Sequence, residues 1–146
     1  MKNDRRTIFG WAMYDWANSA YITIFGAVIG AFFTGTIMPD DRYWGLSGEA
    51  LFSLLVGLGS ILLMLAMQVL GAMADYAEAK KRYLQGFMLL GSLFVLVTPF
   101  IQDGQVALFL LVTLVGQFGF VAANVFYDGF LPEIATDDTI DKVSSK

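Results

Sequence analysis

Carboxylate, amide and hydroxyl side chains stand inside stretches of this sequence that otherwise contain mostly apolar residues. The first group begins at Asp15, Asn18 and Ser19. If the segment is helical, at about 100° per residue, the group falls within an arc of about 140°. One face of this helix would then carry mostly polar or small side chains. The residues on this face are Asp15, Asn18, Ser19, Ile22, Thr23, Gly26 and Gly30.

A second polar group recurs near the end of the last apolar stretch, where Thr113, Gln117, Asn124 and Asp128 fall within an arc of about 60°. An ionised carboxylate at the centre of a membrane span costs at least about 2.5 kcal/mol, so such groups usually face a water-filled cavity or a partner. A carboxyl group desolvated in a cavity can exchange protons near neutral pH. We therefore expect a substrate or coupling cavity formed by Asp15, Asn18, Ser19, Gln117, Asn124 and Asp128.

Structural roles could also account for these residues. Asp15 lies at the start of its helix, where the helix dipole favours a negative charge, and Asp128 lies where the last span leaves the membrane. The three amides could hydrogen-bond neighbouring helices together. Close helix packing is the predicted role of the Gly26 and Gly30 pair and of a row in the second span: Ser53, Gly57, Ser60, Met64, Gln68 and Gly71.

The elements that must position these groups are membrane-spanning helices. The composition is 57% hydrophobic and only 15% charged, which is more apolar than a soluble domain of this length requires. About 20 apolar helical residues match the hydrocarbon core of a bilayer. Four uncharged runs satisfy this, the first of them from Trp16 to Pro39. They predict an all-α membrane protein with spans at about residues 8–39, 50–74, 83–102 and 104–127. Pro39, Asp40 and Asp41 are expected to end the first span.

The distribution of cations predicts how these spans are oriented. Lys and Arg concentrate in cytoplasmic loops. Of the nine Lys and Arg residues, the outer loops would contain only Arg42 if both chain ends are cytoplasmic. The others would lie at the N-terminus, in a hairpin at residues 75–82 and in an acidic cytoplasmic tail at residues 128–146. We therefore predict an N-in, C-in topology.

Several classes of function are excluded by the residues that the sequence lacks. It contains no Cys and no His, which removes thiol nucleophiles, Cys/His metal sites and imidazole acid-base chemistry. Acidic residues outnumber basic ones, and the sequence shows no basic surface, so a nucleic-acid partner is not expected.

An intramembrane aspartyl protease is one enzyme class that could use Asp15 and Asp128. Its second motif, glycine-x-glycine-aspartate, is missing from the sequence. We expect neither an enzyme nor a cofactor.

The hairpin between the second and third spans carries a recognisable motif. Residues 71–82 read GAMADYAEAKKR, with Gly71, Asp75 and a cluster of cations at Lys80, Lys81 and Arg82. This resembles the loop between the second and third helices of major facilitator superfamily transporters. The resemblance implies that Gly71 allows close helix approach and that Asp75 and the cations latch a cytoplasmic gate. Tyr76 and Glu78 depart from that pattern, because a cation and a glycine are common at these positions.

Three further segments narrow the resemblance. Residues 11–21 (WAMYDWANSAY), 74–76 (ADY) and 126–135 (FYDGFLPEIA) resemble the vacuole-effluxer branch of this superfamily, which includes fungal vacuolar amino-acid exporters. That family has about twelve spans, so the resemblance implies that this chain is an amino-terminal fragment. In the family fold the first and fourth helices line the cavity. Alternating access between two halves would require the remaining helices of a full-length chain.

We therefore predict part of a secondary transporter that exports a small solute, with an amino acid as a candidate and a proton as the candidate coupling ion. Two alternatives stay open. One is a complete four-helix proton antiporter acting as a dimer, and the other is a membrane scaffold subunit without transport activity. The expected partners are the lipid bilayer, the solute and the remaining helices. The bacterial cytoplasmic membrane is the expected location, with a vacuolar membrane as the alternative.

Overall fold

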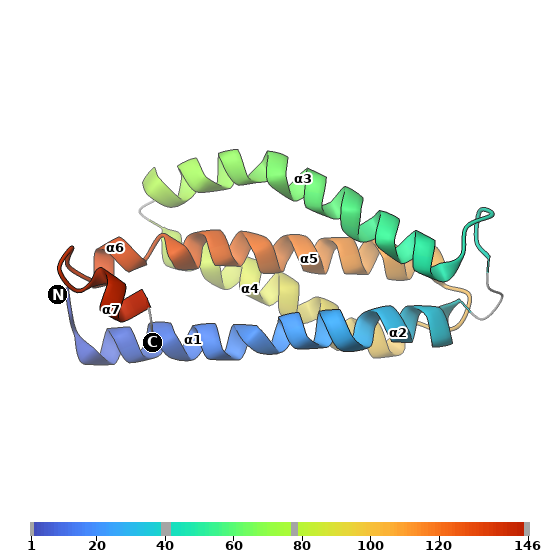
Figure 1. The fold of residues 1–146 in the computed structure, drawn as a ribbon, viewed down its shortest axis with the longest axis horizontal. Coiled ribbons are helices and arrows are strands. Elements are labelled where there is room, and N and C mark those ends of the chain that lie inside the picture. The colour runs from blue at the N-terminus through green and yellow to red at the C-terminus, as the bar shows by residue number, and fades with distance from the viewer. Residues whose placement is uncertain (1, 39–41, 77–78, 145–146) are drawn as a thin grey trace.

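Four long helices dominate the computed structural model, which describes residues 2–38, 42–76 and 79–144. They are α1 (Arg5–Ile24) with its continuation, α3 (Gly48–Tyr76), α4 (Lys80–Val97) and α5 (Val106–Asp128). Each is long and apolar enough to cross a membrane. The all-α class with four candidate spans, predicted from sequence, is therefore confirmed. Figure 1 shows α5 between α1 and α3, with α4 behind it.

The first span is one long rod that begins before the predicted residue 8. The Asp4 carboxylate caps it by accepting hydrogen bonds from the Thr7 backbone N–H (2.9 Å) and the Thr7 hydroxyl (2.7 Å). Beyond α1 the rod continues through a π-helical segment (Phe25–Ile29), the short α2 (Gly30–Phe32) and a second π-helical segment (Phe33–Ile37). The predicted stop at Pro39, Asp40 and Asp41 lies outside the described residues.

The hairpin between α3 and α4 is shorter than the sequence predicts. Helix α3 extends to Tyr76 and α4 already begins at Lys80, so Lys80, Lys81 and Arg82 form the first turn of α4. The long aliphatic stems of Lys and Arg allow this, because they let the charge reach the interface while the backbone stays helical. The cations are therefore helical residues and do not lie in a loop.

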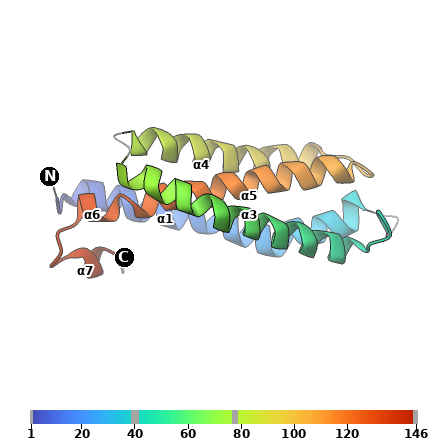
Figure 2. The same ribbon diagram turned by 90° about the horizontal axis from the view of Figure 1, so that it is seen from above.

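Helices α4 and α5 form the closest pair, and glycines make this contact possible. A Cβ atom added at Gly119 would lie 2.6 Å from the Gly91 nitrogen and 2.9 Å from the Phe87 carbonyl oxygen, both backbone atoms of α4. Gly116 leaves the space that Phe94 fills. Figure 2 shows the two helices side by side, and in Figure 1 α4 passes behind α5.

The close packing predicted from the first two spans is only partly observed. A Cβ atom at Gly30 would lie 3.3 Å from the ring of Phe52 on α3, so this glycine does stand at a helix contact. Gly26, Gly57 and Gly71 have nothing within 4 Å of such an atom. Within the described residues these three glycines therefore have no packing neighbour, and close helix approach at them stays a prediction.

Aromatic side chains fill the end of the bundle where α2 and the start of α5 lie. The buried rings of Phe33 and Phe109 stack with centroids 4.9 Å apart, and Phe94 and Ile29 belong to the same cluster. The Ile37 carbonyl oxygen accepts a hydrogen bond of 3.0 Å from the Gly104 N–H, which joins the first span to the α4–α5 connection. This end fixes α1 against α5.

At the opposite end the chain after α5 folds back onto the N-terminus. Helices α6 (Leu131–Ile134) and α7 (Ile140–Ser144) bury Ile134 and Val143 against Ile8. Asn3 binds this segment through its backbone N–H, which donates to the Ile134 carbonyl oxygen (2.7 Å), and through its amide, which donates to Thr136 Oγ1 (2.8 Å). The segment after α5 therefore packs as a cap on the start of α1.

Candidate solute and coupling site

Helix α1 meets α5 through a row of aromatic side chains. Trp11, Tyr14 and Tyr21 recur at helical spacing, so they share one face. Trp11 stacks on Tyr127 (centroids 4.6 Å apart, planes at 11°), and Tyr14 stacks on the same ring at 4.8 Å. Tyr21 stacks on Phe120 at 4.1 Å. Trp11 and Tyr127 also exchange hydrogen bonds, each side chain donating to the other residue's backbone carbonyl at 3.3 Å. These ring stacks and hydrogen bonds hold α1 against α5.

A pair of amides lies between these two stacks. Asn18 Nδ2 donates a hydrogen bond of 2.6 Å to Asn124 Oδ1, and both residues are half-buried. In an apolar environment such a bond joins two helices because the alternative is an unpaired polar group. The structure therefore brings together two residues that the sequence predicted on separate polar faces.

The two predicted carboxylates, Asp15 and Asp128, lie beside this amide pair. Both side chains are exposed within the described residues, and their negative charges interact electrostatically across the α1–α5 contact. Ser19 is exposed as well, and its hydroxyl donates to the Asp15 backbone carbonyl oxygen at 3.1 Å. Asp15 and Ser19 thus form an uncovered polar face on α1, and Asp128 continues it on α5.

Gln117 lies apart from the other members of the predicted cavity. Its side chain packs against α3, where a Cβ atom at Gly59 would lie 2.6 Å from Gln117 Oε1. That oxygen is buried without a hydrogen-bond partner, as is the Thr113 hydroxyl four residues earlier. The polar residues of α5 therefore divide between two neighbours, with Asn124 bound to α1 and Gln117 against α3.

The residues of the predicted gate have different surroundings. Lys80 forms an ion pair with Glu133 and donates a hydrogen bond of 3.4 Å to the Gly129 carbonyl oxygen. Lys81 and Arg82 are exposed. The Asp75 side chain lies outside what the structure describes. Glu133 lies in the motif at residues 126–135, but its pairing with Lys80 was missed by the sequence reasoning, because the two residues are far apart in sequence.

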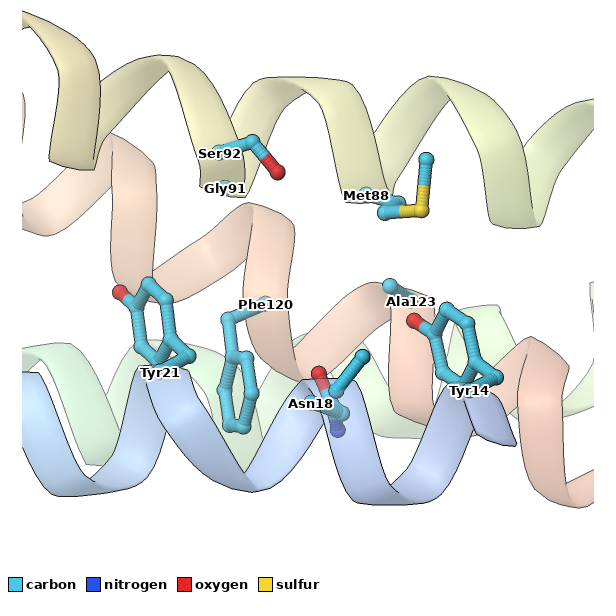
Figure 3. Close-up of a pocket in the computed structure, with 9 residues that line it drawn as sticks. Tyr14, Asn18, Tyr21, Met88, Gly91, Ser92, Phe120 and Ala123 are labelled. Atoms are coloured by element: carbon cyan, nitrogen blue, oxygen red, sulfur yellow. The ribbon is translucent and has the colours of Figure 1, made fainter. Parts of the chain in front are cut away.

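A cavity of about 180 Å³ adjoins the amide pair between α1, α4 and α5 (Figure 3). Asn18, Tyr14 and Tyr21 line it from α1, Phe120 from α5 and Ser92 from α4. The sequence reasoning treated the third span as nearly all apolar and therefore missed Ser92. Helical spacing could have found Tyr14 and Tyr21, which share the face of Asn18.

Comparison with known proteins adds a family to this geometry. Residues 46–146 match the sequence model of the family described as "Vacuole effluxer Atg22 like". The chain is 28% identical over 146 residues to a Bacillus subtilis (strain 168) protein described as an uncharacterized MFS-type transporter, YxiO. The alignment covers all of this chain and 34% of that protein, so the chain spans about a third of this relative's length. No solved structure matches.

Proposed function

The chain belongs to the vacuole effluxer Atg22-like family, and on that premise we propose that it forms the amino-terminal part of a secondary transporter that exports a small solute. It is a multi-pass membrane protein with four apolar helices, and its family and its relative are named for transport, not for an enzymatic reaction. An amino acid is the candidate solute. The bacterial cytoplasmic membrane is the proposed location, supported by the bacterial relative.

The observation that best supports this function is the polar contact between α1 and α5. Two helices that only pack against each other in lipid need no polar side chains at their contact, because lipid tails are as apolar as the side chains buried between helices. Here the Asn18–Asn124 hydrogen bond lies between aromatic stacks, with Asp15 and Asp128 exposed beside it. Polar and ionisable groups are costly in a span and typically mark solute or ion pathways.

Asp15 and Asp128 are the proposed coupling residues. When one carboxylate binds a proton, its repulsion with the other is removed, so the charge state of the pair can favour one arrangement of α1 relative to α5 over another. Asn18 and Asn124 would move with these helices and offer hydrogen-bonding groups to the solute. Alternating access then requires the helices that lie outside this chain.

The proposed cytoplasmic gate consists of Gly71, Asp75, Lys80, Lys81 and Arg82. The Lys80–Glu133 ion pair supports part of this role, because it joins the start of α4 to the segment after α5. Gly71 has open space where a Cβ atom would lie, so a further helix could approach α3 closely at this position. Asp75 enters the proposal only through its place in the motif.

Transport in proteoliposomes tests the function. The natural protein that contains these residues is reconstituted, and uptake of a panel of radiolabelled amino acids is measured with and without an imposed pH gradient. We expect at least one amino acid to be transported at a rate that depends on the gradient. If none is transported, the amino-acid assignment is wrong.

Substitutions then test proton coupling. Asp15→Asn and Asp128→Asn remove a titrating group and keep the side-chain shape, so at least one should abolish the dependence of transport on pH. Asp103→Asn is the matched control, because Asp103 lies in the turn between α4 and α5. Unchanged pH dependence in both Asp15→Asn and Asp128→Asn would exclude the coupling role and leave transport itself unaffected.

A further inference from the structure

The cavity between α1, α4 and α5 lies on a different side of α1 from the proposed coupling face. Ala17 and Tyr21 line the cavity, whereas Asp15 and Ser19 do not. At about 100° per residue, Ala17 and Ser19 point about 160° apart around the helix axis. The cavity is therefore separate from the carboxylates, and Asn18 is the residue between the two faces.

The chemistry of the cavity wall favours an uncharged occupant. None of the residues that line it is charged, and three of them contribute aromatic rings: Tyr14, Tyr21 and Phe120. An ion placed among these rings would lose its hydration without gaining a charged partner. A neutral ring, in contrast, could contact the aromatic side chains at little cost in desolvation.

One polar atom in the wall has unused hydrogen-bonding capacity. Asn18 uses its amide nitrogen to bind Asn124, and Figure 3 shows its carbonyl oxygen turned toward the cavity. The Tyr21 hydroxyl also lacks a hydrogen-bond partner, but it is buried and points away from Asn18, beyond the Phe120 ring. The Asn18 carbonyl oxygen could therefore accept a hydrogen bond from a molecule in the cavity.

The size of the cavity limits what can enter it. An apolar protein cavity of about 150 Å³ is large enough to bind benzene, and this one measures about 180 Å³. We propose that the cavity is a binding site for an uncharged single-ring molecule that carries a hydroxyl group. The ring contacts Tyr14 and Phe120, and the hydroxyl donates a hydrogen bond to the Asn18 carbonyl oxygen.

Binding of 4-fluorophenol tests this proposal without any measurement of transport. The probe is titrated into the natural protein in detergent, and its ¹⁹F NMR signal reports the bound fraction. We expect saturable binding of 4-fluorophenol and none of 4-fluorobenzoate, which has the same ring with a charge at neutral pH. Saturable binding of both probes, or of neither, would overturn the proposal. Transport is measured separately, so failure of binding would leave the proposed function standing.

Two substitutions locate the bound probe. Ala17→Phe places a ring in the cavity and should abolish saturable binding. Ala20→Phe is the matched control, because it adds the same ring to an exposed position on α1 that does not line the cavity. It also corrects for partition of the probe into detergent micelles. Equal binding by these two variants would show that the probe binds elsewhere and would overturn the proposal.

Tyr21→Phe tests the placement of the hydroxyl of the probe. The substitution keeps the ring that stacks on Phe120 and removes only a hydroxyl that is buried away from the cavity, so the fold and the affinity for 4-fluorophenol should both be retained. One hydrogen bond of ordinary strength corresponds to a change in affinity of about fivefold. A loss of that size in Tyr21→Phe would overturn the assignment of Asn18 as the partner of the probe's hydroxyl.

Discussion

The hydrogen bond between Asn18 and Asn124 is the most consequential single contact between α1 and α5. It joins two side chains that are distant in sequence, and its length of 2.6 Å leaves no room for a water between them. The surrounding contacts are ring stacks, which tolerate sliding of one helix along the other, and two longer hydrogen bonds of 3.3 Å between Trp11 and Tyr127. The amide pair is therefore the contact that sets the register of α1 on α5.

Replacing one member of the Asn18–Asn124 pair should lower the free energy of unfolding more than replacing both members. Asn18→Leu leaves the Asn124 amide without its partner, and we expect a loss of about 0.5–2 kcal/mol in the free energy of unfolding. The double variant Asn18→Leu, Asn124→Leu should recover part of that loss. Chemical unfolding in detergent of the four members of a double-mutant cycle measures this. Strictly additive effects would mean that the hydrogen bond does not couple the residues.

Asp4 gives a prediction about pH at the start of α1. Its hydrogen bonds from the Thr7 side chain and backbone lower the pKa of the carboxyl below the ordinary value of 3.8. Because the folded pKa is the lower one, the stabilisation is present above 3.8 and is lost as the pH falls through the folded value. The carboxyl ¹³C shift of Asp4 should therefore titrate below 3.8. In Asp4→Asn the amide can still cap the helix, but the first turn should no longer respond to acid.

The π-helical segments and the glycine contacts are features of the elements rather than of single residues. Two π-helical segments within the first span, Phe25–Ile29 and Phe33–Ile37, shift the register of its faces. A constant 100° per residue thus describes α1 well up to Ile24 and less well beyond it. In α4 and α5 the helix is regular, and Gly91 and Gly119 allow the two backbones to approach.

The α4–α5 contact predicts opposite effects for two glycine substitutions. Gly119→Ala would place a methyl group against backbone atoms of α4, which cannot move aside as a side chain can, and overpacking of this kind costs about 1–3 kcal/mol. Gly10→Ala in α1 meets nothing within 4 Å and should stabilise the helix by about 0.4–1 kcal/mol. Unfolding of both variants in the same detergent measures the difference. Equal effects would show that α4 and α5 are not in close contact at Gly119.

For the molecule as a whole, the uneven distribution of Lys and Arg between the two ends of the bundle predicts its orientation in the membrane. Lys81 and Arg82 begin α4 at one end of the bundle, and Arg42 lies in the α2–α3 connection at the other end (Figure 1). The positive-inside rule then places Lys81 in the cytoplasm and Arg42 outside. The Lys80–Glu133 ion pair joins two segments at the proposed cytoplasmic end.

Cysteine labelling in intact cells tests this orientation. The chain contains no Cys, so single Arg42→Cys and Lys81→Cys substitutions can be labelled without background. A membrane-impermeant maleimide should react with the cysteine at position 42 in intact cells and with that at position 81 only after the membrane is opened. Labelling of both positions from the same side would exclude the N-in, C-in topology.

The four apolar helices and the family could be predicted from the sequence alone, because runs of uncharged residues and short motifs such as residues 11–21 are local properties of the chain. It also placed Asn18 and Asn124 on polar helix faces. Which helix each face meets became visible only in the folded bundle. Periodicity identified Gln117 and Asn124 as members of one stripe, yet one packs against α3 and the other binds α1. The physical reason is that the spacing of residues sets their directions around a helix axis, whereas the neighbour in each direction is chosen by helix packing over the whole bundle.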